Sequence, residues 1–401
     1  MSQEPNNISN DLRGVSSLTV DAVVGATDLV ESLHATITSA SRVVGEPRRK
    51  RKRGVVGLVY RHIRTMTELV GLGIDVPLNQ LGLLLGEQES SPQREAILSA
   101  LNGFLGDHLA TTNNPLAIPM QLRREGRPLS DDALAQIVQR AGGKIVIMVH
   151  GLCVNDLHWH RQGHDHGAAL ARDLGITPVY VNYNSGLHIS ENGRNLSALL
   201  EKMITHAAQP VELYIVAHSM GGLVARSACY YAESSNHTWR NHLQKMIFLG
   251  TPHHGAPLEK GGNRLGALLG ISPYSAPFSR LGKVRSSGIT DLRYGNVVDA
   301  DWQGRNRFEL TGDQRTHVPL PQDVHCYALA ATTDKALYIR GEDIIGDGLV
   351  PVSSALGDHK NDERNLIFPE AHQWIGRPMN HIDLLTHPDV YKQIRMWLAS
   401  A

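Results

Sequence analysis

The sequence is poor in cysteine, in aromatic residues and in net charge. Its 401 residues include three cysteines, Cys153, Cys229 and Cys326, whose spacing fits neither a disulfide framework nor a metal knuckle. Aromatic residues make up 5% of the chain, which is too few for platforms that stack single-stranded nucleic acid. Lys plus Arg and Asp plus Glu both number 39, so the whole chain has no long-range attraction to nucleic acid. We therefore expect reduced thiols and no nucleic-acid partner.

Long hydrophobic runs are also absent. Nowhere do about 18 apolar residues follow one another, as a transmembrane helix requires. The polar opening segment, MSQEPNNISNDLRG, lacks the basic and then apolar pattern of a secretory signal. Together with the reduced thiols, these absences lead us to expect a cytoplasmic protein. Hydrophobic residues nonetheless make up 41% of the chain, which is enough for a sizeable core.

The first 140 residues have a helical pattern. We expect a disordered tail over residues 1–15 and a helical section over residues 16–140. Apolar residues recur at helical spacing over residues 18–40 and again over residues 55–85, and a proline begins a further helical segment over residues 92–101. The apolar stripes of this section require burial, so we expect it to pack on the rest of the chain or to form the interface of a homo-oligomer.

A run of six consecutive basic residues, from Arg48 to Arg53, interrupts this section. Such a run is typical of a solvated linker between helices. The alternative is contact with an anionic partner, of which we favour an anionic membrane surface, bound peripherally.

From Lys144 onward, short β-rich runs alternate with segments long enough for helices. The runs are KIVIMV, PVYVNY, LYIVA, KMIFLG and VHCYALA. This alternation predicts an α/β fold with a mostly parallel sheet and right-handed crossovers. The segment after the first run, VHGLCVN, has no G-x-G-x-x-G fingerprint, which disfavours a dinucleotide-binding oxidoreductase. We expect no cofactor.

One serine lies where a buried strand gives way to a helix, in VELYIVAHSMGGLVAR. Ala217 and Gly221 lie two residues on either side of Ser219, which is the small-x-Ser-x-small spacing of a nucleophile elbow. Such an elbow raises the serine oxygen above the sheet and places the N–H of Met220 at a helix N-terminus. The alternative is a strand-to-helix turn with an incidental serine.

A serine nucleophile requires a base and an acid that orients the base, and in open α/β sheets these lie after other strands. In GEDIIGDGLVPVSSA, Asp347 lies between two glycines that let a carboxylate point inward; Asp343 is its competitor. In RPMNHIDLLTHPDVY, His381 precedes a helical segment and is the candidate base. His372 and His387 are its rivals.

Other histidine-rich motifs are expected to have structural roles. The segment HGLCVNDLHW follows the first strand and places the N–H of Leu152 as a second oxyanion donor beside that of Met220. The segment HWHRQGHDH has spacing that could suit zinc, but no regular element is predicted that would bring its histidines together. We expect loop histidines from His158 to His166 and no metal.

The chain resembles the bacterial lipase and esterase branch of the α/β-hydrolase superfamily, including the lipase-like domain of glycosylphosphatidylinositol deacylases. The motifs that carry the resemblance occur in the order VHGLCVNDLHW, AHSMGGLVAR, GTPHHGAP, GDGLVPVSSA and NHIDLL. The resemblance implies a hydrolase core over residues 141–401, with helices flanking the sheet and a cap insertion at about residues 255–322. It also implies that Ser219 is the nucleophile, His381 the base and Asp347 the orienting acid.

The expected cap contains apolar residues in a Gly/Pro-rich segment, and an apolar cap above a serine suggests an acyl-chain pocket or a lid. We expect the substrate-binding side chains to be Leu265, Leu268, Leu269 and Phe278. An ordinary surface excursion is the alternative. We also expect residues 16–140 to pack close to this cap.

These features favour a serine carboxylic-ester hydrolase that acts on small-molecule or lipid-like esters with apolar acyl groups; whether polyesters are also substrates depends on the shape of the pocket. An acyltransferase or thioesterase with the same triad is the second hypothesis, because only the acceptor of the acyl group differs. A non-catalytic scaffold that binds lipid or a partner is the third hypothesis.

Overall fold

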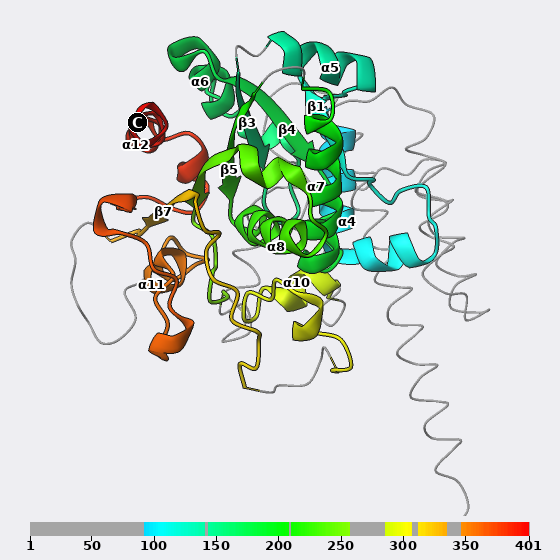
Figure 1. Ribbon diagram of the computed structural model, residues 1–401. Helices are drawn as coiled ribbons and strands as arrows, with labels where there is room; N and C mark the ends of the chain where they lie inside the picture. The colour runs from blue at the N-terminus through cyan, green and yellow to red at the C-terminus, as the bar shows by residue number, and fades with distance from the viewer. Residues whose placement is uncertain are drawn as a thin grey trace, which may run out of the picture.

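The computed structural model describes residues 92–140, 143–207, 210–256, 285–306, 312–334 and 346–400. Within them, the chain forms an eight-stranded sheet in the order β2-β1-β4-β3-β5-β6-β7-β8 (Figure 1). All pairings from β4 to β8 are parallel, and β1 and β2 add an antiparallel edge. The strands are β1 (Gln121–Arg124), β2 (Arg127–Pro128), β3 (Lys144–Val149), β4 (Thr177–Asn182), β5 (Glu212–His218), β6 (Leu243–Leu249), β7 (His325–Ala331) and β8 (Gln373–Gly376).

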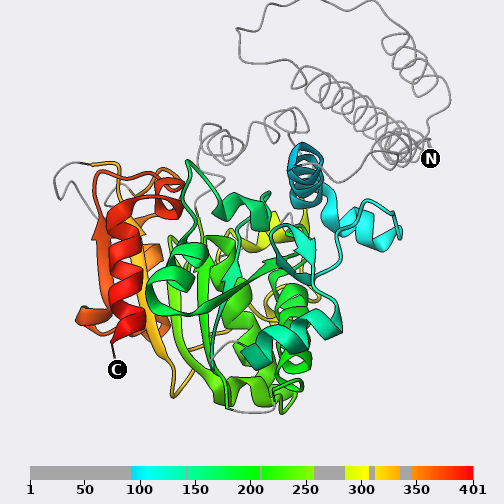
Figure 2. The same cartoon turned by 90° about the horizontal axis from the view of Figure 1, so that it is seen from above.

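Helices cover both faces of this sheet. Side chains of α7 and α8 belong to the same core cluster as Ile145 and Ile147 of β3, whereas α6 and α12 pack with Val146 and Met148 on the opposite face (Figure 2). This alternation explains why the β3 run is apolar at every position after its first, as a strand buried on both faces must be. The helices are α4 (Pro92–Thr111), α5 (Asp131–Arg140), α6 (His166–Leu174), α7 (Ile189–Ile204), α8 (Met220–Ser234), α10 (Ser287–Asp291), α11 (Val352–Leu356) and α12 (Pro388–Ala399).

The expected fold class, a mostly parallel α/β sheet flanked by helices, is confirmed. The five β-rich runs of the sequence correspond to β3 to β7. The sheet begins earlier than expected, however, because β1 and β2 lie in the section that was predicted to be helical. Each strand is too short for an alternating pattern to be visible, and the pair is set by a turn at Gly126 and by pairing with β4.

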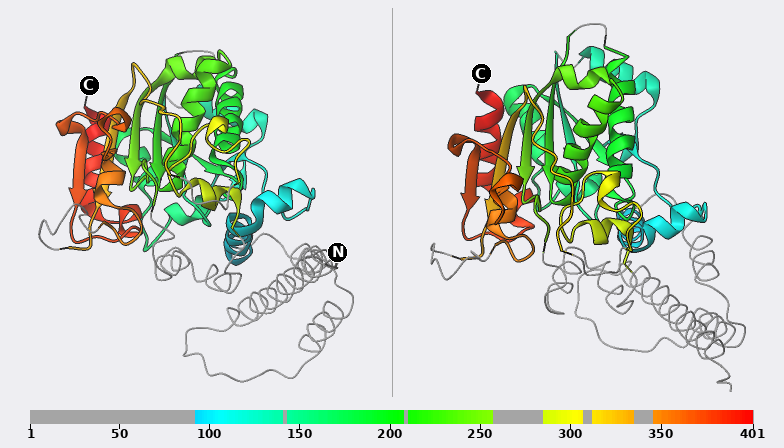
Figure 3. Two further views of the ribbon diagram at one scale, coloured as in Figure 1. Left: turned by 90° about the horizontal axis from the view of Figure 1, so that it is seen from below. Right: turned by 60° about the horizontal axis from the view of Figure 1, so that its bottom comes forward.

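Helix α4 packs on the loops that follow β3 and β4. A Cβ atom on Gly103 would lie 2.3 Å from Sγ of Cys153, so the helix backbone approaches that loop directly. Asn184 donates a hydrogen bond of 2.9 Å to the carbonyl of Gly106, and Ser286 donates one of 2.6 Å to the carbonyl of Gly103. The helix that was predicted over residues 92–101 therefore exists, continues to Thr111 and is docked. Figure 3 shows α4 and α12 at opposite ends of the sheet.

Several expectations concern residues outside those described. They are the tail, the helical segments over residues 18–40 and 55–85, the basic run from Arg48 to Arg53 and about half of the cap. The domain boundaries drawn from the sequence therefore stay predictions. Among the described helices, none combines the length and the apolar character that a membrane crossing requires.

Candidate active site

Ser219 forms a strained turn between β5 and α8. Its φ of 56° and ψ of −128° lie outside the regions that L-residues ordinarily occupy. The neighbouring backbone is tightly packed, because a Cβ atom on Gly221 would lie 2.4 Å from the carbonyl oxygen of His150. The Ser219 N–H donates to the carbonyl of Leu249 at 2.8 Å, which ties the turn to the end of β6. This is the strand–turn–helix context that a nucleophile elbow requires.

The structure brings His381 and Asp347 together in the interior. Nδ1 of His381 lies 2.6 Å from Oδ2 of Asp347, and both side chains are buried. The other carboxylate oxygen of Asp347 accepts hydrogen bonds from the N–H groups of Leu349 and Val350, at 2.9 and 2.8 Å. Because the carboxylate accepts the proton of Nδ1, Nε2 of His381 is left as the acceptor. That atom is buried and has no hydrogen-bond partner among the described residues.

Gly250 joins the serine turn to this pair, and the sequence reasoning missed it. It follows β6 directly, next to the residue that accepts the hydrogen bond of Ser219. A Cβ atom there would lie 3.2 Å from Oδ2 of Asp347, 3.2 Å from Cε1 of His381 and 2.7 Å from Leu384. Its φ of 58° also favours glycine. The signal was available, since a glycine that ends a strand can mark a close backbone approach.

We expect Gly250→Ala to lower kcat at least about 10-fold, because the added methyl group displaces the carboxylate or the imidazole from a geometry that tolerates little misplacement. Gly175→Ala is the matched control. Gly175 has a similar φ of 67° but no atom near its ideal Cβ, so this change adds backbone strain without a clash. Steady-state kinetics and thermal unfolding of both variants measure the two effects. Unchanged kcat in Gly250→Ala would show that the side chains tolerate the methyl group.

His218 is a second residue that the sequence reasoning missed. It immediately precedes Ser219, is buried, and its ring lies 4.6 Å from that of His381. Its Nε2 lies 3.1 Å from the backbone carbonyl of His381, which is the geometry of an N–H donor to that oxygen. Burial lowers the pKa of His218 well below its ordinary value, so the ring stays neutral. His218 thus fixes the backbone position of the imidazole that Asp347 holds.

The loop after β3 lies against the serine. A Cβ atom on Gly151 would lie 3.0 Å from Cβ of Ser219, so the backbone of this loop comes close to the elbow. Leu152 and Met220 are both buried, and no hydrogen bond within the described residues uses the N–H of either. His150 stacks on Tyr183 with ring centroids 4.2 Å apart and bonds to the carbonyl of Gly151 at 2.8 Å.

The rivals of the acid and the base lie elsewhere. Nδ1 of His372 bonds to the carbonyl of Cys326 at 3.0 Å, and His387 caps α12. Neither forms a hydrogen bond to Asp347 within the described residues. Asp343 lies outside the described residues. So do the substrate-binding candidates, Leu265, Leu268, Leu269 and Phe278.

The histidines from His158 to His166 are not all loop residues as expected, because His158 lies in a 3₁₀ turn and His166 begins α6 and is buried. Nε2 of His164 lies 2.8 Å from Nδ1 of His166, whose other nitrogen lies 3.0 Å from the carbonyl of Leu384. His166 therefore bonds to the segment that follows His381. Over the described ranges, no group of three or more His, Cys, Asp or Glu side chains is arranged to hold a metal ion.

Buried neutral histidines should make the protein sensitive to acid. Burial lowers the pKa of His150 to about 3 and that of His166 to about 4. Below about pH 6.5 the unfolded chain binds protons that the native state excludes, so the free energy of unfolding falls as the pH decreases, by about 1.4 kcal/mol per pH unit for each such histidine. Urea unfolding between pH 7.5 and 4.5 measures this slope. Constant stability down to pH 5 would contradict it.

Known proteins are similar to this chain in sequence and in architecture. Residues 140–318 match the model of the PGAP1-like alpha/beta domain. Among solved structures, the mature form of a Bacillus licheniformis lipase is 19% identical, with a TM-score of 0.44, covering 71% of this chain and 98% of the lipase. Aspergillus fumigatus lipase B is 13% identical, with a TM-score of 0.39, and the match covers 93% of this chain and 76% of the lipase.

A Pyrobaculum calidifontis esterase is 12% identical, with a TM-score of 0.39, covering 80% of this chain and 99% of the esterase. No curated protein sequence matches the chain. Residues 140–318 are thus similar to a PGAP1-like α/β domain, which confirms the resemblance stated from the sequence motifs at the level of the superfamily. The chain has the fold of the α/β-hydrolase superfamily.

Proposed function

We propose that the protein is a serine carboxylic-ester hydrolase that acts on apolar acyl esters. The observation that carries the proposal is the buried His381–Asp347 pair, joined through Gly250 to the strained turn at Ser219. Acyl transfer needs a nucleophile, a base and an acid that orients the base, and these residues supply all three.

In this proposal, Nε2 of His381 accepts the proton of the Ser219 hydroxyl as its oxygen attacks the ester carbonyl. The proton then passes to the leaving alcohol, and an acyl-enzyme remains. Water repeats the sequence with His381 as the base and releases the acid. Asp347 holds the imidazole in the tautomer that accepts at Nε2.

The N–H groups of Leu152 and Met220 are proposed to stabilise the negative oxygen of the tetrahedral intermediate. Both are unused by other hydrogen bonds among the described residues, and Met220 opens α8, where the helix dipole also favours negative charge. Removing one such donor typically costs about 10²–10³ in kcat.

Two tests address this function. A fluorophosphonate probe should label the folded protein once, on the peptide that contains Ser219. A series of chromogenic esters from acetyl to palmitoyl, with Ser219→Ala as the control, should then show activity that depends on the serine and rises with acyl length. Absence of labelling would favour a non-catalytic scaffold that binds lipid or a partner.

Extensions of the same series of esters test which molecule accepts the acyl group. Faster turnover of thioesters, or transfer of the acyl group to an added alcohol, would assign the thioesterase or acyltransferase alternative. Release of soluble acid from a polyester film tests the polymeric substrate. Activity only on the shortest esters would contradict the apolar acyl pocket.

The N-terminal section, together with the cap, is proposed to form part of the wall of the apolar acyl pocket. Its described helix α4 supports the proposal, because Gly103 lies directly against Cys153, the neighbour of Leu152. Peripheral membrane contact through the run from Arg48 to Arg53 and a homo-oligomeric interface both stay predictions.

A further inference from the structure

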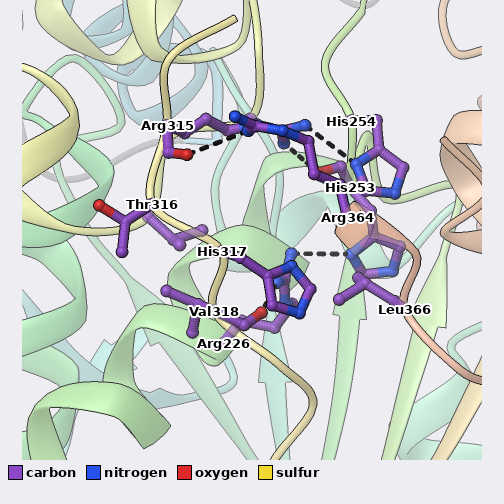
Figure 4. Close-up of a pocket in the computed structure, with 11 residues that line it drawn as sticks. Arg226, His253, His254, Arg315, Thr316, His317, Val318, Arg364 and Leu366 are labelled. Carbon is purple, nitrogen blue, oxygen red and sulfur yellow. Dashed lines mark hydrogen bonds between the residues drawn. The ribbon is translucent and has the colours of Figure 1, made fainter. Parts of the chain in front are cut away.

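A pocket rich in cationic side chains lies beside α8, beyond the serine turn. It is a shallow pocket that opens to solvent. Figure 4 shows Arg226, His253, Arg315 and His317 gathered around this space. The proposed ester hydrolysis uses none of them.

Arg226 is a buried cation without a carboxylate partner among the described residues. One terminal nitrogen donates to the carbonyl of Val318, and the other lies 3.4 Å from Nδ1 of His253. Its Nε is buried and has no partner among the described residues. Burial lowers the pKa of Arg226 to about 10, which still leaves it charged at neutral pH. Buried charges in proteins are ordinarily paired, because removal from water is costly.

His253 adds a second unused donor. Because its Nδ1 faces a nitrogen of Arg226, which can only donate, the ring proton lies on Nε2. That Nε2 is buried and has no partner among the described residues. Burial, with the nearby Arg226, lowers the pKa of His253 well below its ordinary value, so the ring is neutral. Within the part of the chain that the structure describes, two buried donors on pocket-lining residues thus lack an acceptor.

The carboxylates near the pocket are already engaged. Asp313 pairs with Arg315 at 2.9 Å and with Arg364 at 3.3 Å. Asp301 accepts hydrogen bonds from the N–H groups of Val297, Val298 and Thr316. Within the described residues, neither carboxylate forms an ion pair with Arg226.

We propose that this pocket binds an oxyanion of the phosphate or sulfate class. The ion lies at the open side of the pocket, at Thr316 and His317, and Nε of Arg226 and Nε2 of His253 are donors on its lining residues that remain unused within the described residues. Guanidinium groups suit such oxyanions because they donate in a planar fork and remain charged. The site requires an acceptor that is negatively charged, since among the described residues the surrounding guanidinium groups outnumber the carboxylates paired with them.

The pocket is mechanically linked to the serine turn. Arg226 lies on α8, whose N-cap residue is Ser219. On the same helix, a Cβ atom on Gly222 would lie 2.0 Å from Oγ1 of Thr251. Thr251 and His253 belong to the segment that continues from Gly250, which contacts His381 and Asp347. A bound oxyanion would therefore brace the segment that supports the catalytic pair.

The test is inorganic phosphate added to the full-length protein at constant ionic strength, followed by thermal unfolding and by isothermal titration calorimetry. We expect a saturable rise in Tm of several degrees and one bound phosphate per chain, with sulfate competing. In Arg226→Met, the saturable part should vanish and only the gradual rise that phosphate causes in most proteins should remain.

Calorimetry on the unaltered protein keeps the proposal testable if Arg226→Met does not fold. Absence of one-to-one binding there, or an equal saturable shift in Arg226→Met, would overturn the proposal. The source of the oxyanion is resolved with two esters that share an acyl group, one neutral and one with a phosphorylated alcohol. If phosphate competitively inhibits hydrolysis of the phosphorylated ester only, the pocket is a substrate subsite. If phosphate binds without inhibiting hydrolysis of either ester competitively, the pocket is a site for the free ion.

Discussion

Ser219→Ala is expected to lower kcat for ester hydrolysis by about 10⁶, because the triad works as a unit and removing its nucleophile leaves only the oxyanion donors and substrate binding. The fold should persist, since no side-chain hydrogen bond of Ser219 supports α8. Kinetics on a chromogenic ester, with circular dichroism to check folding, measure the effect.

The matched control for that change is Ser234→Ala, which removes a hydroxyl from the other end of the same helix. Ser234 is exposed and bonds only to the carbonyl of Tyr231 among the described residues. The Ser234→Ala variant should retain full activity. If Ser219→Ala kept more than about one hundredth of the wild-type kcat, another residue would have to be the nucleophile.

Asp347→Asn is expected to lower kcat by about 10⁴ with little change in the fold. The amide oxygen can still accept from the N–H groups of Leu349 and Val350, so the tight loop keeps its hydrogen bonds. The amide nitrogen then faces Nδ1 of His381 as a donor. The imidazole must place its proton on Nε2, and it can no longer accept the proton of Ser219.

Asp343→Asn is the control for this second change, because Asp343 is the competitor in the same sequence motif. It should leave kcat within a few-fold of wild type. The reverse result, with activity lost in Asp343→Asn and retained in Asp347→Asn, would transfer the role of the acid. Assays on the same neutral ester make the two variants directly comparable.

The sequence was most informative where local pattern determines structure. The apolar runs predicted β3 to β7, and the small residues around Ser219 predicted a sharp turn. Asp347 was chosen for its place between two glycines after a strand and His381 for its place before the last helix, and the structure brings Oδ2 of Asp347 within 2.6 Å of Nδ1 of His381. Their catalytic roles stay predictions until they are measured.

Features that depend on contacts between distant segments could not be predicted in this way. The β1–β2 pair forms at this edge of the sheet because β1 pairs with the otherwise free side of β4. No local sequence pattern indicates this pairing. Gly250 and His218 matter through a carboxylate and an imidazole that lie far along the chain. The cationic pocket likewise depends on Arg226 and Arg315 meeting from separate segments.

The contact between His218 and His381 has a consequence for the timing of folding. The two residues are 163 positions apart, so the ribosome adds the second on the order of ten seconds or more after the first. Throughout that interval a nascent chain contains Ser219 but not its proposed base. Closing so long a loop is also entropically costly and slow compared with forming local helices. The serine should therefore remain chemically inert during synthesis and become reactive only when the last segment of the sheet has docked.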